Sequence, residues 1–159
     1  MRHPRDREEL IDFLVDDEWP FHGRRHVESA DVDALSFSGA DVETFWIVDG
    51  EQTVGLIRLF DLDDIGRGAP QFDLRIARRH RGRGHGTRAT AWIVEHLFDM
   101  GPEVHRIEAT TRDDNTAMQQ ALTTAGFTLE GRLRASWPCD DGTWFDTMVF
   151  GLLRTDRAT

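Results

Sequence analysis

The stretch Asp73–Phe98, which reads DLRIARRHRGRGHGTRATAWIVEHLF, is the part of this chain that best indicates its fold. Phe72, Leu74 and Ile76 alternate as the apolar residues of a short strand, and a helical apolar pattern follows later in the stretch. Between them lies a turn rich in arginine and glycine, RGRGHGT, over residues 81–87. The sequence therefore predicts a strand, a basic turn and a helix in direct succession.

The turn is basic although the chain as a whole is acidic. From Arg75 to Arg88 there are six arginines and no acidic residue, whereas the whole chain has a net charge of −10. The N-terminus of a helix offers unpaired backbone N–H groups and the positive end of a dipole. Gly82, Gly84 and Gly86 leave the backbone open to an anion. We predict that the turn binds phosphate; a plain turn with solvated arginines is the alternative.

Two common phosphate-binding patterns do not fit this turn. The nucleoside-triphosphate loop needs a lysine, and all 19 basic residues of this chain are arginine. The dinucleotide pattern G-x-G-x-x-G has a different spacing from the G-x-G-x-G found here. A nucleotide-phosphate site is therefore disfavoured.

The bulk composition is that of an ordinary globular protein. With 159 residues, 39% hydrophobic and 30% charged, the chain is expected to form a single domain over residues 1–159. It has no apolar run of ~18 residues, so we expect no membrane contact. One cysteine, Cys139, excludes an internal disulfide and suits a cytoplasmic protein. The negative charge argues against nucleic acid and suits a cationic substrate such as an amine.

The expected elements follow the order α-α-β-β-β-α-β-α-β-β. Besides the central strand and helix, they are helices at residues 5–15, 29–37 and 115–125 and strands at residues 42–48, 53–62, 106–111, 127–135 and 144–153.

Local signals mark several of the element ends. Ser29 is the expected N-cap of the second helix, and Thr116 with Gln119 fits a capping box. Asp49-Gly50 predicts a hairpin turn, and Gly101-Pro102 ends the central helix. The apolar face of that helix is expected to comprise Ala89, Ile93, Leu97 and Met100.

Two motifs carry a resemblance to a known family. The sequence R-G-R-G-H-G-T resembles the R/Q-x-x-G-x-G/A signature of the GNAT superfamily of acyl-CoA-dependent N-acetyltransferases. Asp114–Ala117, followed by Ala125–Gly131, resembles the N-x-x-x…G-F-x-x-E-G segment of the RimJ and RimL branch, whose enzymes modify N-terminal amines of ribosomal proteins. Arg132–Arg134 and Asp146 also fit that branch.

The resemblance implies an α/β fold: a mixed, mostly antiparallel, twisted sheet of about six strands, flanked by helices and splayed for acetyl-CoA. It implies transfer of an acetyl group from acetyl-CoA to a primary amine by direct attack in a ternary complex, with no metal. The acceptor, a protein N-terminus or a small molecule, stays open, as does a homodimer. A non-catalytic acyl-CoA sensor is the alternative.

The resemblance also implies which residues hold the cofactor. The pyrophosphate cradle would be Arg81, Gly82, Arg83, Gly84, His85, Gly86 and Thr87, with the His85 side chain facing phosphate. Leu74 and Ile76, core residues by side chain, would pair with the pantetheine arm through their backbone, and an N–H there would hold the oxyanion. Asn115 would contact the same arm, or cap a helix.

The catalytic side chains are less well defined. The chain has no tyrosine, and the serine and glutamate of RimL-like relatives correspond to Met118 and Trp137. Glu108 is the first candidate for general base, with an ion pair to an arginine as its alternative. The other base candidates, in order, are Asp73 and then Asp61 and Asp63.

Three further features have a functional and a structural interpretation. The aromatic loop at residues 19–23 either caps the core or lines a substrate site, and the core cap is favoured. His22 in that loop is a candidate for the pocket wall, or an ordinary neutral histidine. An acyl-enzyme at Cys139 is disfavoured, because no base partner is indicated near it.

Overall fold

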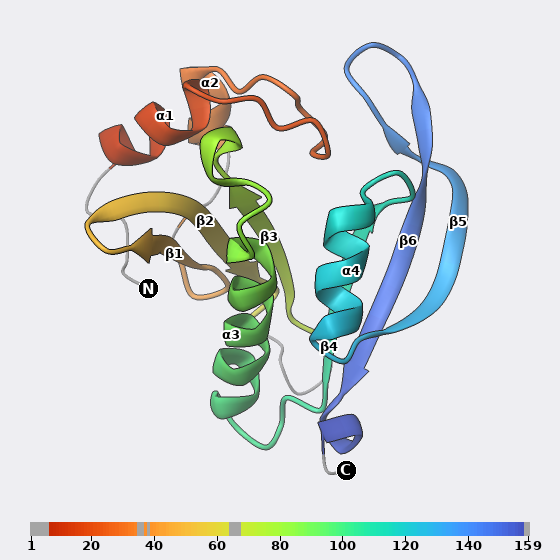
Figure 1. Cartoon of the computed structure of the whole chain (residues 1–159). Coiled ribbons are helices and arrows are strands. Elements are labelled where there is room, and N and C mark those ends of the chain that lie inside the picture. The colour runs from red at the N-terminus through yellow and green to blue at the C-terminus, as the bar shows by residue number, and fades with distance from the viewer. Residues whose placement is uncertain (1–6, 35–36, 38, 64–67, 158–159) are drawn as a thin grey trace.

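Six strands form two three-stranded sheets in the computed structural model, which describes residues 7–34, 37, 39–63 and 68–157 (Figure 1). The first sheet has the order β1-β2-β3 and the second the order β4-β6-β5. The strands are β1 (Glu43–Asp49), β2 (Gln52–Phe60), β3 (Gln71–Ile76), β4 (Arg106–Arg112), β5 (Thr128–Pro138) and β6 (Trp144–Leu153). All four ladder pairs are antiparallel. The predicted α/β fold with about six mostly antiparallel strands is confirmed.

The helices occur in the predicted order. They are α1 (Arg7–Val15), α2 (Ser29–Ala34), α3 (His85–Asp99) and α4 (Thr116–Thr124), with short 3-10 turns at Arg78–His80 and Arg154–Arg157. Residues 5–6 and 35–36, which the prediction assigned to the first two helices, lie outside the described residues. Phe37, the predicted end of the second helix, is not helical. No helix in the described part of the chain is long and apolar enough to cross a membrane.

The first sheet is covered on both faces, which explains its long apolar strands. On one face α3 packs over the first sheet, beside α4, which packs over the second sheet; Ile57 and Ile93 are fully buried in this core. On the other face α1, α2 and the loop between them cover Trp46 and Leu56. Figure 1 shows α1 and α2 gathered at one end of the first sheet, away from the second.

The two sheets approach each other at strands β3 and β4. Their connection among the described residues is one backbone hydrogen bond, from the N–H of Glu108 to the oxygen of Pro70 at 3.1 Å, before β3 begins. The rest of β3 makes no ladder with β4. One edge of β3 is therefore left open beside the helices, as the splayed sheet of the sequence prediction requires.

Two predicted caps and one predicted core residue are wrong. Ser29, the predicted N-cap, is instead the first helical residue of α2. A side-chain bond at this helix start comes from Asp31, whose carboxylate accepts the N–H of Glu28 at 2.9 Å. Thr116 does not form a capping box with Gln119, whose side chain donates to the Asp113 oxygen at 2.8 Å. Met100 is 37% exposed because it follows the last residue of α3.

Candidate active site

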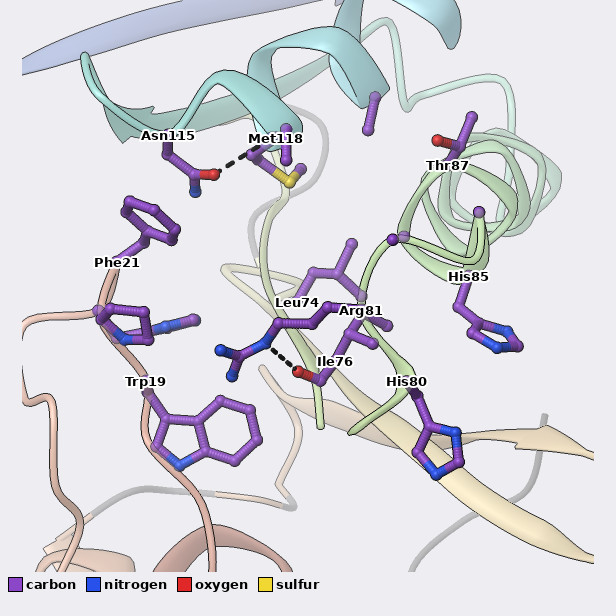
Figure 2. Close-up of a pocket in the computed structure, with 17 residues that line it drawn as sticks. Trp19, Phe21, Leu74, Ile76, His80, Arg81, His85, Thr87, Asn115 and Met118 are labelled. Atoms are coloured by element: carbon purple, nitrogen blue, oxygen red, sulfur yellow. Dashed lines mark hydrogen bonds between the residues drawn. The ribbon is translucent and has the colours of Figure 1, made fainter. Parts of the chain in front are cut away.

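A cavity of about 250 Å³ lies at the open edge of β3 (Figure 2). Four segments line it: the aromatic loop before α2, the end of β3, the turn into α3 and the start of α4. The lining residues are Trp19, Pro20, Phe21, His22, Leu74, Ile76, His80, Arg81, Gly82, Gly84, His85, Gly86, Thr87, Asn115, Ala117, Met118 and Ala121. Nine of the ten predicted cofactor-binding residues are among them, Arg83 being the exception.

The turn into α3 presents a row of backbone N–H groups. Gly82 and Gly84 have φ of 73° and 77°, a left-handed backbone that glycine adopts without strain. Gly84 is the N-cap, so the N–H groups of His85, Gly86 and Thr87 have no acceptor within the helix. Among the described residues we find no hydrogen-bond partner for any backbone N–H from residue 82 to 87. Such a concave row of donors fits an anionic group.

The backbone of β3 is directed into the same cavity. The N–H of Ala77 donates to the oxygen of Val54 at 3.0 Å, which fixes a hydrogen-bonded pair just beyond the ladder. Because such pairs alternate along antiparallel strands, Arg75 bonds to β2. The N–H and C=O groups of Leu74 and Ile76 therefore face the open edge. The Ile76 oxygen already accepts from Arg81, so the Leu74 N–H and C=O and the Ile76 N–H are left for an extended ligand.

Leu74 and Ile76 are half-buried, not core residues as predicted. Their side chains pack at the border of the α3 core and also line the cavity. Asp73 and Arg75 alternate with them and point to the opposite face, toward α1 and Trp19. The cavity thus reaches around the edge of β3, from the α3 face to the face that carries the aromatic loop.

Arg81 shapes the turn with its side chain. Its Nε–H donates to the backbone oxygen of Ile76 at 2.8 Å, and its Nη2 donates to the backbone oxygen of Glu18 at 2.6 Å. Figure 2 shows the first of these bonds at the mouth of the cavity. The guanidinium is therefore engaged with the protein on two sides.

The structure does not support a His85 ring that faces phosphate. The ring is only 6% exposed, and its Nδ1 lies 2.9 Å from Nη2 of Arg88. Its Nε2 lies 3.8 Å from the Asp49 carboxylate. The first turn of α3 directs the ring toward the β1–β2 hairpin, so only the backbone N–H of His85 is available to an anion.

Asn115 is the N-cap of α4, at the opposite wall of the cavity. Its Oδ1 accepts the N–H of Met118 at 3.2 Å (Figure 2), and its Nδ2 donates to the Thr111 hydroxyl at 3.1 Å. Met118 lines the cavity and packs against the main core. The capping role, one of the two predicted for Asn115, is confirmed; a ligand contact stays a prediction.

Glu108 lies outside the cavity lining. Its carboxylate accepts from Nε of Arg106 at 2.9 Å, and Arg106 also pairs with Glu130 at 2.5 Å. The hydrogen bonds to Glu130 and Glu108 raise the pKa of Arg106 above its usual range despite desolvation. Glu108 faces away from the buried side of β4, and the structure favours the ion-pair interpretation over the catalytic one.

Asp73 is joined to a residue that sequence spacing does not link to it. Its Oδ1 lies 2.8 Å from Nε2 of His22, and its Oδ2 accepts from Nε of Arg75 at 3.0 Å. Burial acts to raise the pKa of Asp73, but His22 and Arg75 outweigh it, so the pKa lies below its ordinary value. Asp61 and Asp63 are exposed and outside the cavity lining.

The aromatic loop caps the core, as favoured by the sequence, and also lines the cavity; a contact with substrate stays a prediction. Trp19 is 1% exposed, belongs to the α1 core and donates from Nε1 to the Leu14 oxygen at 2.8 Å. The same residue lines the cavity, together with Phe21. Cys139 contacts Arg112 at 3.5 Å and does not line the cavity.

Comparison with known proteins identifies the kind of domain. The model of the family described as acetyltransferase (GNAT) domain matches residues 1–128. None of the curated proteins matches the chain.

Solved structures share the fold. A putative acetyltransferase superposes with a TM-score of 0.76 at 18% identity, over 93% of this chain and 80% of that one. The Vibrio cholerae spermidine N-acetyltransferase in complex with CoA and spermine gives 0.66 at 20% identity, over 75% and 69%. Mycobacterium smegmatis RimJ in complex with CoA-disulfide gives 0.65 at 26% identity, over 75% and 56%.

Proposed function

This chain belongs to the GNAT acetyltransferase domain family, and we propose that it transfers an acetyl group from acetyl-CoA to a primary amine by direct attack in a ternary complex. One observation carries the proposal. The unpaired N–H groups of residues 82–87 and the open edge of β3 converge on the same cavity. A ligand with a pyrophosphate and an extended amide arm would satisfy both at once.

The residues of the cavity fit coenzyme A in three places. The backbone from Gly82 to Thr87 would hold the pyrophosphate, with Arg83 adding positive charge from its exposed position. Leu74 and Ile76 would pair with the amide arm, and α4 would close the other side near Asn115. When bound, acetyl-CoA supplies an activated acyl group and a thiolate leaving group.

The protein's part in the chemistry is to orient, polarise and remove a proton. A backbone N–H on the open edge of β3 would hold the negative charge that develops on the acyl oxygen. An ammonium group has no lone pair with which to attack, so one proton must be removed first. No tyrosine is present to protonate the leaving sulfur, and Met118 occupies the serine position of RimL-like relatives. Water would supply that proton.

The acceptor would be a cationic amine, either a protein N-terminus or a small molecule. The net charge of −10 attracts cations, and one structurally similar enzyme was solved with spermine. The cavity also reaches the face of β3 that carries the aromatic loop, which gives the amine a route separate from that of the cofactor. We further propose that residues 1–159 act as one domain.

An acyl-CoA sensor is the second candidate, favoured by Met118 at the position where relatives carry a catalytic serine. The separating experiment measures thiol release from acetyl-CoA, with and without polyamines, aminoglycosides and peptides of varied N-terminus. Release that depends on one class of amine supports the transferase. Calorimetric binding of coenzyme A without such release supports the sensor, and absence of binding contradicts both.

A further inference from the structure

The structure assigns the role of general base to His22, held in place by Asp73. This inference rests on the proposed acetyl transfer. His22 lines the cavity on the side of the aromatic loop, and its Nε2 lies 2.8 Å from Oδ1 of Asp73, 51 residues away in sequence. Of the side chains suggested by the sequence for proton removal, Glu108, Asp61 and Asp63 lie outside the cavity lining.

The contacts of Asp73 determine which nitrogen of His22 carries a proton. The Asp73 carboxylate is paired with the buried Arg75 guanidinium, so it is ionised and can only accept hydrogen bonds. Its Oδ2 is taken by Arg75, and its Oδ1 faces Nε2 of His22. Nε2 of the neutral imidazole therefore carries the hydrogen, and the lone pair is at Nδ1.

Nδ1 of His22 is without a hydrogen-bond partner in the described part of the chain. It is buried, with less than 1 Å² of accessible surface, and among the described residues it makes no hydrogen bond. An unpaired buried acceptor is costly, so this atom is suited to accept a hydrogen bond from a bound group. An ammonium group has only donors and is the complementary partner. Since protein covers Nδ1, we expect the loop carrying His22 to shift when the amine enters.

Asp73 itself is a poor proton acceptor. Both of its oxygens already accept hydrogen bonds, and the neighbouring positive charge favours its ionised form. It touches no reacting atom and is a positioning residue, which holds the tautomer and orientation of the imidazole. Charges of both signs surround the loop. Arg75 and Arg81 lie over the Trp19 ring, and Arg112 donates to the Pro20 oxygen. The nearby carboxylates are engaged: Asp114 with Arg112, Glu18 with Arg25, Asp17 4.0 Å from Arg81, and Asp140 with the Arg25 N–H.

His22 and water account for every proton that moves in the reaction. Nδ1 of His22 takes one proton from the ammonium, and the resulting amine forms an N–C bond to the acetyl carbonyl carbon. The C–S bond breaks, and its electron pair leaves with sulfur. The remaining surplus proton on nitrogen passes through water to the thiolate, and the imidazolium releases its proton to solvent. The products are the amide, the thiol and one proton.

Two small amines test the base directly. At pH 7 ethylamine is protonated, whereas 2,2,2-trifluoroethylamine is largely free amine because its fluorines withdraw electrons. We expect His22→Gln to lower kcat/KM for ethylamine by about 10² to 10⁴, the usual contribution of a general base. The loss for trifluoroethylamine should be at least ~10-fold smaller, since it needs no initial deprotonation. His26→Gln, in the same loop but outside the cavity lining, is the control.

Nuclear magnetic resonance of ¹⁵N-histidine protein gives a readout independent of turnover. With coenzyme A present, His22 should show the tautomer protonated at Nε2, and Asp73→Asn should change it. The midpoint of its titration should match the acidic limb of the ethylamine pH profile, a coincidence that a merely structural role would not produce.

The outcomes distinguish failure of the His22 assignment from failure of the proposed acetyl transfer. Equal losses for the two amines, or a tautomer protonated at Nδ1, overturn the assignment of His22. If the wild type binds coenzyme A but acetylates neither amine, the proposed function is weakened for simple amines. The tautomer of His22, measured by nuclear magnetic resonance, then tests the His22–Asp73 pair by itself. Calorimetry on each variant checks that coenzyme A still binds.

Discussion

Nε of Arg81 donates to the backbone oxygen of Ile76 at 2.8 Å, so a side chain ties the basic turn to the last residue of β3. The second bond of Arg81, to the Glu18 oxygen, ties the same turn to the segment after α1. Neighbouring arginines in one motif therefore have different roles. Arg81 fixes the shape of the turn, whereas Arg83 is exposed and forms no ion pair among the described residues.

Arg81→Ala and Arg83→Ala should separate these roles. Loss of Arg81 should lower the free energy of unfolding by about 1–3 kcal/mol, because two carbonyl groups lose a charged donor. Loss of Arg83 should leave stability within about 0.5 kcal/mol and weaken coenzyme A binding in a salt-dependent way. Urea unfolding and calorimetry at two salt concentrations measure both. Equal effects of the two variants on stability would contradict the different roles assigned to Arg81 and Arg83.

Gly84→Glu should abolish coenzyme A binding. Gly84 is the N-cap of α3, and a carboxylate there would place negative charge beside the unpaired N–H groups and oppose a pyrophosphate. Like charges in contact cost several kcal/mol, so we expect at least ~100-fold weaker binding by calorimetry. Gly142→Glu is the matched control, because Gly142 also has a positive φ, 82°, but lies in the β5–β6 turn. Unchanged binding by Gly84→Glu would refute the phosphate site.

Met118→Ser should leave kcat unchanged or raise it modestly. The chain lacks the tyrosine that often protonates the leaving thiolate, and a hydroxyl at position 118 could assist this step. Removal of a half-buried methionine from the edge of the core should reduce stability by about 1–2 kcal/mol. Thiol release and thermal unfolding measure the two effects. A large loss of kcat in a folded variant would show that Met118 positions a substrate.

Glu108→Gln should change kcat/KM by less than about threefold, far below the contribution of a general base. Glu108 pairs with Arg106 and does not line the cavity. Glu130→Gln, which removes the other partner of Arg106, is the control and should behave alike. A selective loss for Glu108→Gln, within the ~10² to 10⁴ range and with coenzyme A binding retained, would restore Glu108 as the base.

Asp73→Asn should cost stability in a pH-dependent way. The pKa of Asp73 is lower in the folded protein than in the unfolded chain, so the folded state favours the ionised form. Its contribution is complete above the unfolded pKa and is lost as pH falls toward the folded value. The stability gap between wild type and Asp73→Asn should therefore shrink below about pH 4. Urea unfolding at pH 7 and pH 3 measures the gap; a gap that stays constant contradicts the shift.

Local patterns along the chain were sufficient for the order of elements and for the glycine-rich turn at residues 81–87 that leads into α3. Glycine at positions 82 and 84 permits the left-handed backbone of the turn, and a helix N-terminus has unpaired N–H groups whatever surrounds it. The ends of elements were less well predicted. Asn115 rather than Thr116 caps α4, since several nearby polar side chains can serve as caps and only packing selects one.

Side-chain roles in the candidate site depended on distant segments. The sequence made Glu108 a base candidate by its strand position, but the fold places Arg106 and Glu130 beside it. The sequence also predicted that the His85 side chain faces phosphate, but the fold turns the ring toward Asp49. Residues 106 and 108 share one face of β4, so their contact follows from strand alternation. The contacts of Arg106 with Glu130 and of His85 with Asp49 have no local signal, because each joins different elements.

The sequence by itself determined the family, the order of helices and strands and the backbone of the glycine-rich turn at residues 81–87, because periodicity and glycine act over a few neighbouring residues. Only the tertiary structure decided which side chains meet. His22 and Asp73 are 51 residues apart. They are joined because the aromatic loop packs across the face of the first sheet that α1 and α2 cover. Contacts of that kind are set by the packing of whole elements, which spacing along a single chain does not encode.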